Sequence, residues 1–147
     1  MNLDTKIPPP VVTIFILLVI YFFSLKEFDL NYKLISIILL TAGTIFIFSA
    51  VFQFIKRKTT VNPTKPHKTS SLVISGTFKV TRNPMYLGML LIIMSYAFYK
   101  FSIISLLLIP LFIFYINKFQ IEPEEYEMRK KFGKEYEDYC KKVDRWI

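Results

Sequence analysis

The sequence contains few of the residues from which soluble enzymes build metal sites and disulfides. Its 147 residues include one cysteine, Cys140, and one histidine, His67. An internal disulfide is therefore excluded, a metal site built from these residue types is not expected, and His67 reads as an exposed loop residue. Charged residues make up only 20% of the chain. We expect any chemistry to run without a protein-held metal.

Apolar residues are abundant instead, at 53% of the chain with a mean hydropathy of +0.41, which is too apolar for an ordinary soluble domain. We predict an all-α membrane protein of one domain with about four transmembrane helices. A crossing needs about 20 apolar residues, and the expected helices are residues 8–25, 34–55, 85–99 and 101–117. The last two are expected to form a helical hairpin around Lys100. The first run has no small-residue cleavage site after it and should be retained.

Positive charge is unevenly distributed along the chain. All but three of the 19 basic residues fall near the N-terminus, in the loop 56–83 or in the tail 118–147, and the three are Lys26, Lys33 and Lys100. Basic residues mark the cytoplasmic side of membrane proteins. We therefore expect a multi-pass protein of a prokaryotic inner membrane with both termini in the cytosol. A net charge of +8 placed this way favours membrane lipids over nucleic acid as partners.

The tail 118–147 is expected to be helical, amphipathic and cytosolic. Pro123 is expected to open a charged helix and Gly133 to end it, with a second short helix at 134–143. The apolar face of this second helix is formed by Tyr136, Tyr139, Cys140 and Val143. Such a face is suited to lying against the bundle or the membrane interface, with Cys140 in packing.

A polar cluster stands where the third apolar run meets the basic loop. Asn83 is a good N-cap and Pro84 a good first helical residue, so a helix should begin here with its free N–H groups at the interface. Together with Arg82 this helix end could hold a carboxylate or phosphate. A capped helix with a snorkelling arginine explains the same residues.

Acidic and aromatic residues of the tail are the second group of candidates. Glu124 and Glu125 stand in the first turn of the expected tail helix, where the helix dipole favours acids, and adjacent side chains point about 100° apart. One is expected to bind a ligand and the other to cap or pair. Arg145 beside Trp146 could form a second anion clamp, although tyrosine and tryptophan there also suit interfacial anchors.

Taken in order, several of these residues form a recognisable set. The set is Leu72-Val73, Gly76, Phe78, Arg82-Asn83-Pro84-Met85-Tyr86-Leu87-Gly88, Pro123-Glu124-Glu125, Phe132-Gly133, Tyr136, Tyr139, Val143 and Arg145-Trp146. It resembles the integral-membrane isoprenylcysteine carboxyl methyltransferases and the related phospholipid N-methyltransferases. The resemblance implies methyl transfer from S-adenosyl-L-methionine to a lipophilic or lipid-linked acceptor arriving from the bilayer.

The resemblance also implies roles for individual residues. Arg82, Asn83, Pro84, Tyr86 and Gly88 would line one side of the cofactor site, Glu124 and Glu125 the other, and Tyr136 and Tyr139 would cover it. Arg145 and Tyr86 are the expected catalytic residues, Arg145 to orient an anionic acceptor and Tyr86 to face the sulfonium or stack on the adenine.

The acceptor is expected to be a carboxylate, as in the isoprenylcysteine enzymes, because a carboxylate needs no general base at pH 7. Three alternatives stay open: methylation of a phospholipid or other amine, an NADPH-dependent activity like that of the sterol reductases, which share a tyrosine–cysteine pair here at Tyr139-Cys140, and a non-enzymatic membrane scaffold.

Overall fold

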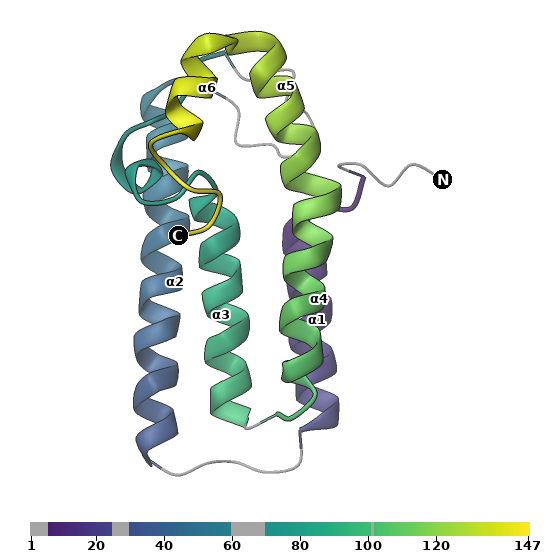
Figure 1. The fold of residues 1–147 in the computed structure, drawn as a ribbon. Helices are drawn as coiled ribbons and strands as arrows, with labels where there is room; N and C mark the ends of the chain where they lie inside the picture. The colour runs from purple at the N-terminus through teal and green to yellow at the C-terminus, as the bar shows by residue number, and fades with distance from the viewer. Residues whose placement is uncertain (1–5, 25–29, 60–69, 101) are drawn as a thin grey trace.

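The computed structural model describes residues 6–24, 30–59, 70–100 and 102–147, and these are helical throughout apart from turns and connections (Figure 1). The helices are α1 (Pro9–Phe23), α2 (Leu30–Lys56), α3 (Pro84–Lys100), α4 (Ser105–Ile116), α5 (Glu122–Phe132) and α6 (Lys134–Cys140). The all-α prediction is confirmed for this part of the chain. The middle of the loop 56–83, with His67, lies outside the described residues.

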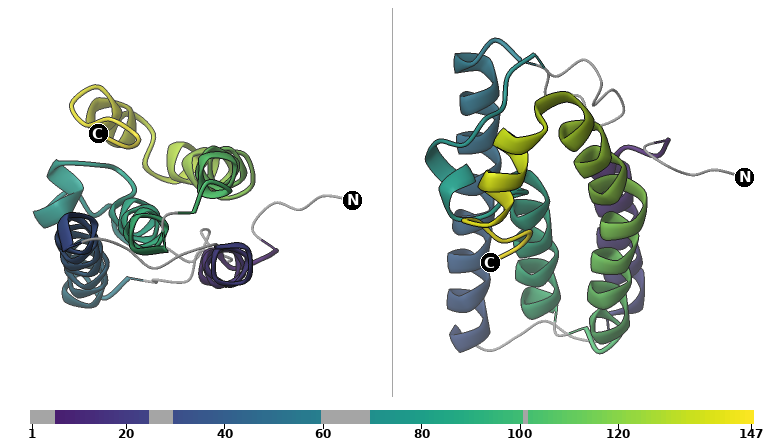
Figure 2. Two further views of the ribbon diagram at one scale, coloured as in Figure 1. Left: turned by 90° about the horizontal axis from the view of Figure 1, so that it is seen from below. Right: turned by 45° about the horizontal axis from the view of Figure 1, so that its top comes forward.

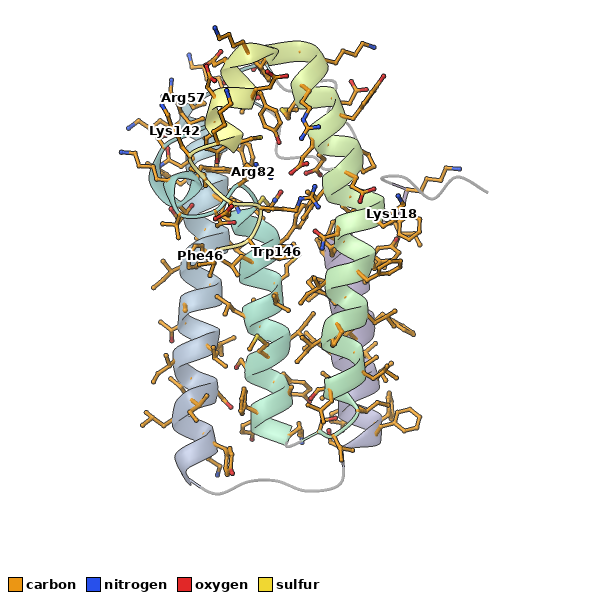
Figure 3. All side chains as sticks on the ribbon, viewed as in Figure 1. Phe46, Arg57, Arg82, Lys118, Lys142 and Trp146 are labelled. Carbon is orange, nitrogen blue, oxygen red and sulfur yellow. The ribbon has the colours of Figure 1, made fainter. Side chains whose placement is uncertain are left out.

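The helices α1, α2, α3 and α4 stand side by side as four rods, and successive rods run in opposite directions (Figures 1 and 2). α5 and α6 gather at one end of these rods with the loop before α3, and the chain after α6 folds back beside α3. The labelled basic residues Arg57, Arg82, Lys118 and Lys142 all lie in this half of the molecule (Figure 3). The expected segregation of positive charge is therefore present in three dimensions.

The outer surface of the rods is strongly apolar. Phe22 on α1, Phe48 on α2 and Leu106 on α4 are 75%, 69% and 74% exposed, which is typical of a surface that faces lipid. Two helices, Tyr32–Lys56 and Ser105–Phe132, are long and apolar enough to cross a membrane, and Pro9–Phe23 is a shorter apolar helix. Four crossings therefore remain a prediction.

The core lies where α1, α3 and α4 meet. Its fully buried members include Ile20 of α1, Ile93 of α3, and Phe112 and Ile116 of α4. The largest contact between two helices is that of α2 with α3. There the two backbones approach so closely that a Cβ added to Gly88 would lie 2.6 Å from the carbonyl oxygen of Gly43.

Several helix boundaries differ from the expected ones, and the short tail helix ends at Cys140 instead of 143. α2 begins at Leu30, four residues before the expected start, because a helix can continue through interfacial polar residues. α4 begins at Ser105, four residues after the expected start, because the Ser105 N–H donates to the Ser102 carbonyl at 3.1 Å and closes a turn. A short 3₁₀ helix, Gly76–Lys79, interrupts the expected loop.

The fourth rod is much longer than expected. Instead of ending at 117, α4 continues through a π-helical segment, Asn117–Ile121, directly into α5. Proline lacks an N–H and its ring clashes with the carbonyl four residues earlier, and the wider π turn just before Pro123 relieves both problems. The helix therefore passes through Pro123 and ends at Gly133, whose φ of +49° suits glycine.

Candidate functional site

The first turn of α3 and the segment before it hold the polar cluster recognised in the sequence. α3 begins at Pro84, as predicted. The side-chain amide of Asn83, the predicted N-cap, donates to the Arg145 carbonyl at 2.9 Å. The backbone N–H of Asn83 donates to the hydroxyl of Thr81 at 3.1 Å. The asparagine thus joins the start of α3 to the C-terminal tail.

Further hydrogen bonds fix the same two segments together. The backbone N–H of Arg82 donates to the Asp144 carbonyl at 2.9 Å, and the hydroxyl of the fully buried Thr81 donates to the Arg145 carbonyl at 3.1 Å. The Trp146 indole N–H donates to Oδ1 of Asn117 at 3.1 Å, so the tail also contacts the fourth rod. In Figure 3, Arg82 and Trp146 both lie beside the upper half of α3. The tail therefore bridges α3 and the α4–α5 helix.

An ion cluster lies at the centre of this bridge. Arg82 Nη2 donates to Glu125 Oε1 at 2.9 Å, while Arg145 donates to the same carboxylate through Nε at 3.1 Å and through Nη2 at 2.8 Å. The side chains of Arg82, Glu125 and Arg145 are 12%, 8% and 34% exposed. Donation to the Glu125 carboxylate raises the pKa of Arg145. Arg145 is therefore the more exposed of the two arginines that donate to Glu125.

Glu124, the adjacent acid, has a different partner. The hydroxyl of the buried Tyr86 donates to Glu124 Oε1 at 2.5 Å. Within the part of the chain that the structure describes, no arginine or lysine forms an ion pair with Glu124, whereas Arg82, Arg145 and, at 3.9 Å, Arg129 surround Glu125. The two carboxylates are therefore chemically distinct, as their divergence on a helix requires.

The two tyrosines of α6 are buried at the back of the cluster. The Tyr139 hydroxyl donates to the Phe78 carbonyl at 2.6 Å, which ties α6 to the 3₁₀ helix. Burial raises the pKa of both Tyr136 and Tyr139, and the charge of Glu125 raises that of Tyr136 further. Both therefore stay neutral, with Tyr139 anchoring the tail and Tyr136 next to the ion cluster.

The sequence-predicted residues thus fall into two groups. Arg82, Asn83, Tyr86, Glu124, Glu125, Tyr136 and Arg145 gather around the ion cluster, whereas Tyr139 and Gly88 lie at packing contacts. Pro84 is fully buried and begins α3. Sequence reasoning missed Thr81 and Asn117, for which the only signal was a polar residue at the edge of an apolar run.

Long apolar helices with a partly buried charged cluster at one end are typical of a helical membrane protein. The sequence profile of the phospholipid methyltransferase family matches residues 32–135. The chain belongs to this family, and the resemblance seen in the sequence is confirmed. Membership indicates a membrane methyltransferase.

One curated relative is an uncharacterised protein of Haemophilus influenzae strain Rd. It is 41% identical over 63 residues, which are 43% of this chain and 100% of the relative. No solved structure matches.

Proposed function

We propose that this protein transfers a methyl group from S-adenosyl-L-methionine to a lipophilic acceptor at the cytosolic face of the membrane. The observation that carries the proposal is that the two adjacent glutamates have different partners. Glu125 accepts hydrogen bonds from two arginines, and Glu124 has only a phenol partner among the described residues. The amino-acid end of the cofactor carries one ammonium and one carboxylate. The site offers a complement to each of these charges.

The side chains present fit that end of the cofactor. A carboxylate in a partly buried site is stabilised by a cation, and Glu124 is the acid without one within the described ranges. Arg82 Nε is buried and has no hydrogen-bond partner in the same part of the chain, so this guanidinium has a donor left for a ligand carboxylate. We therefore assign the cofactor's ammonium to Glu124 and its carboxylate to Arg82, with Glu125 holding the arginines in place.

When bound, S-adenosylmethionine supplies an electrophilic methyl group on a positively charged sulfur. The protein's part is to bind, to align the acceptor atom and to exclude water. Tyr86 and Tyr136 offer buried aromatic rings beside the charged cluster, which suit a cation or an adenine. Trp146 and the tail, held to Asn117 and to the start of α3, cover the cluster.

For the acceptor, we favour a lipid-linked carboxylate oriented by Arg145. This guanidinium is one-third exposed and points into the cluster, so it can bind an anion that arrives from the bilayer. A carboxylate acceptor would attack the methyl group directly, leaving the cofactor as a neutral thioether, and no proton moves.

A phospholipid amine is the second candidate, favoured by the Tyr86–Glu124 contact. An ammonium must lose one proton before its nitrogen can attack. In this alternative Glu124, which has no cationic partner among the described residues, accepts that proton instead of holding the cofactor's ammonium. The two acceptors therefore make different demands on Glu124.

The test begins with binding. The detergent-solubilised protein is titrated with S-adenosylhomocysteine and separately with NADPH by calorimetry. We expect S-adenosylhomocysteine to bind and NADPH not to. Glu124→Gln should weaken binding about tenfold through loss of one charge-assisted contact, while Glu122→Gln, on an exposed turn of the same helix, should leave it unchanged. If the folded protein shows no binding of S-adenosylhomocysteine, the proposal is contradicted. Binding of NADPH alone would favour the reductase alternative.

The acceptor is then identified with membrane lipid extracts and a methyl-labelled cofactor. A base-labile methyl ester indicates a carboxylate, and a base-stable product indicates an amine. Arg145→Lys should lower turnover of a carboxylate acceptor while S-adenosylhomocysteine affinity is kept. Lost affinity for S-adenosylhomocysteine in this variant would move Arg145 to the cofactor.

A further inference from the structure

A second candidate site lies at the other end of the helices, far from the charged cluster. It is an apolar groove of about 710 Å³ formed by α1, α2 and α3. Along α3 its walls run from Ile92 to Tyr99, and Tyr96 is ten residues, about 15 Å, beyond Tyr86. The groove is therefore separate from the proposed methyl-transfer site.

Its lining is unusually regular. Each of the three helices contributes four residues at positions i, i+3, i+4 and i+7, starting at Ile14, Lys33 and Ile92. This spacing places each set on one helix face over two turns, about 10 Å long. One leaflet of a bilayer core is about 15 Å deep, so the groove spans most of one leaflet.

Polarity changes in the same direction on all three helices. Because successive helices run in opposite directions, Ile14 of α1, Leu40 of α2 and Ile92 of α3 lie at the inner end of the groove. The outer end is formed by Tyr21, Lys33 and Tyr99. The hydroxyl of Ser95, in the wall of the groove, donates a hydrogen bond to the Ser36 carbonyl at 2.7 Å. The groove thus has an apolar length and one cationic, phenolic end.

The described charged residues at this end, Lys33 and Lys100, are both basic. Lys33 is exposed and makes no ion pair or hydrogen bond with a described residue, and none of the described residues lining the groove is acidic. The Lys100 ammonium lies 5.6 Å from the ring centroid of Tyr21 and 5.7 Å from that of Tyr99, at the rim of the same end. A hydrocarbon chain joined to an anionic head fits this pattern.

We propose that the groove binds one anionic phospholipid, with an acyl chain along α1, α2 and α3 and its phosphate at Lys33. The complementarity is between one negative headgroup and a cation at the mouth of an apolar groove. The site is independent of the methyl-transfer site, since the two lie at opposite ends of α3. A lipid held there would lie between α1 and α2, both of which pack against α3.

The test is native mass spectrometry of the full chain, titrated with phosphatidylglycerol and with phosphatidylcholine of the same acyl chains. We expect the first phosphatidylglycerol to bind about fivefold more tightly than phosphatidylcholine, the effect of one lysine near a headgroup. Lys33→Gln should abolish this preference. Lys130→Gln, an exposed lysine of α5, should keep it.

A second pair of variants tests the apolar part of the groove. Leu40→Trp places a large ring inside the groove and should weaken binding of both lipids. Ile38→Trp, on an exposed face of the same helix outside the lining, should not. Equal affinity of the wild type for both lipids, a preference that survives Lys33→Gln, or identical behaviour of the two tryptophan variants would each overturn the proposal.

Discussion

Replacing Glu125 by glutamine should release the C-terminal tail. The carboxylate accepts three hydrogen bonds from Arg82 and Arg145, at 2.9, 3.1 and 2.8 Å. Glutamine keeps the shape but removes the charge and turns one acceptor into a donor facing a guanidinium. A charge-assisted hydrogen bond is worth about 1.5–3 kcal/mol. The buried contact to Arg82 should count fully and the more exposed contacts to Arg145 only in part, so we expect a loss of about 3 kcal/mol.

The single cysteine makes this loss measurable at the tail itself. Cys140 is half-buried at the end of α6, and its carbonyl accepts a hydrogen bond from Arg82 Nη1 at 3.3 Å. A thiol-reactive dye therefore reports when α6 leaves the bundle. At about 3 °C per kcal/mol for a chain of this size, the labelling midpoint should fall by about 9 °C in Glu125→Gln.

The matched control is Glu122→Gln in the same helix. Glu122 is paired at 2.8 Å with Lys118, but both side chains are about half exposed, and such pairs contribute little. Its labelling midpoint should stay at the wild-type value. If Glu125→Gln behaved like Glu122→Gln, the ion cluster would not be what holds the tail.

Two further predictions concern the tail and the helix contact. The hydrogen bond from Tyr139 to Phe78 needs a neutral phenol, and burial raises the pKa of Tyr139. The stabilisation from this hydrogen bond is therefore complete below about pH 10 and is lost as pH rises through the folded-state pKa. The fluorescence emission of Trp146, the only tryptophan in the sequence, should shift to the red at alkaline pH, and the shift should be smaller in Tyr139→Phe. If the pH dependence of the emission were identical in Tyr139→Phe and the wild type, Tyr139 would be excluded as the titrating group. Gly88→Ala places a Cβ 2.6 Å from the Gly43 carbonyl and should cost about 2 kcal/mol, seen as earlier thermal loss of helical circular dichroism. If Gly88→Ala unfolded at the wild-type thermal midpoint, the backbones of α2 and α3 would be shown to separate at this contact without loss of stability.

Local sequence signals were sufficient for much of the secondary structure. The helix starting at Pro84, the break at Gly133 and the helices within the four apolar runs follow from residue type and spacing over a few positions. These features depend on backbone geometry and on burial of apolar side chains, which neighbouring residues largely dictate. The same signals were misleading at Pro123, because a π turn accommodated the proline and the helix continued.

The sequence by itself determined that this chain is an apolar, helical protein with most of its basic residues in the loop 56–83 and the tail 118–147, and it supplied most of the candidate site residues. Only the tertiary structure decided how they pair. The direction in which the α4–α5 helix presents Glu124 and Glu125 decides which of them pairs with an arginine, and the fold brings the Asn83 side chain to the C-terminal tail. Such choices depend on contacts between residues 20 to 62 positions apart in the chain, which no local pattern encodes.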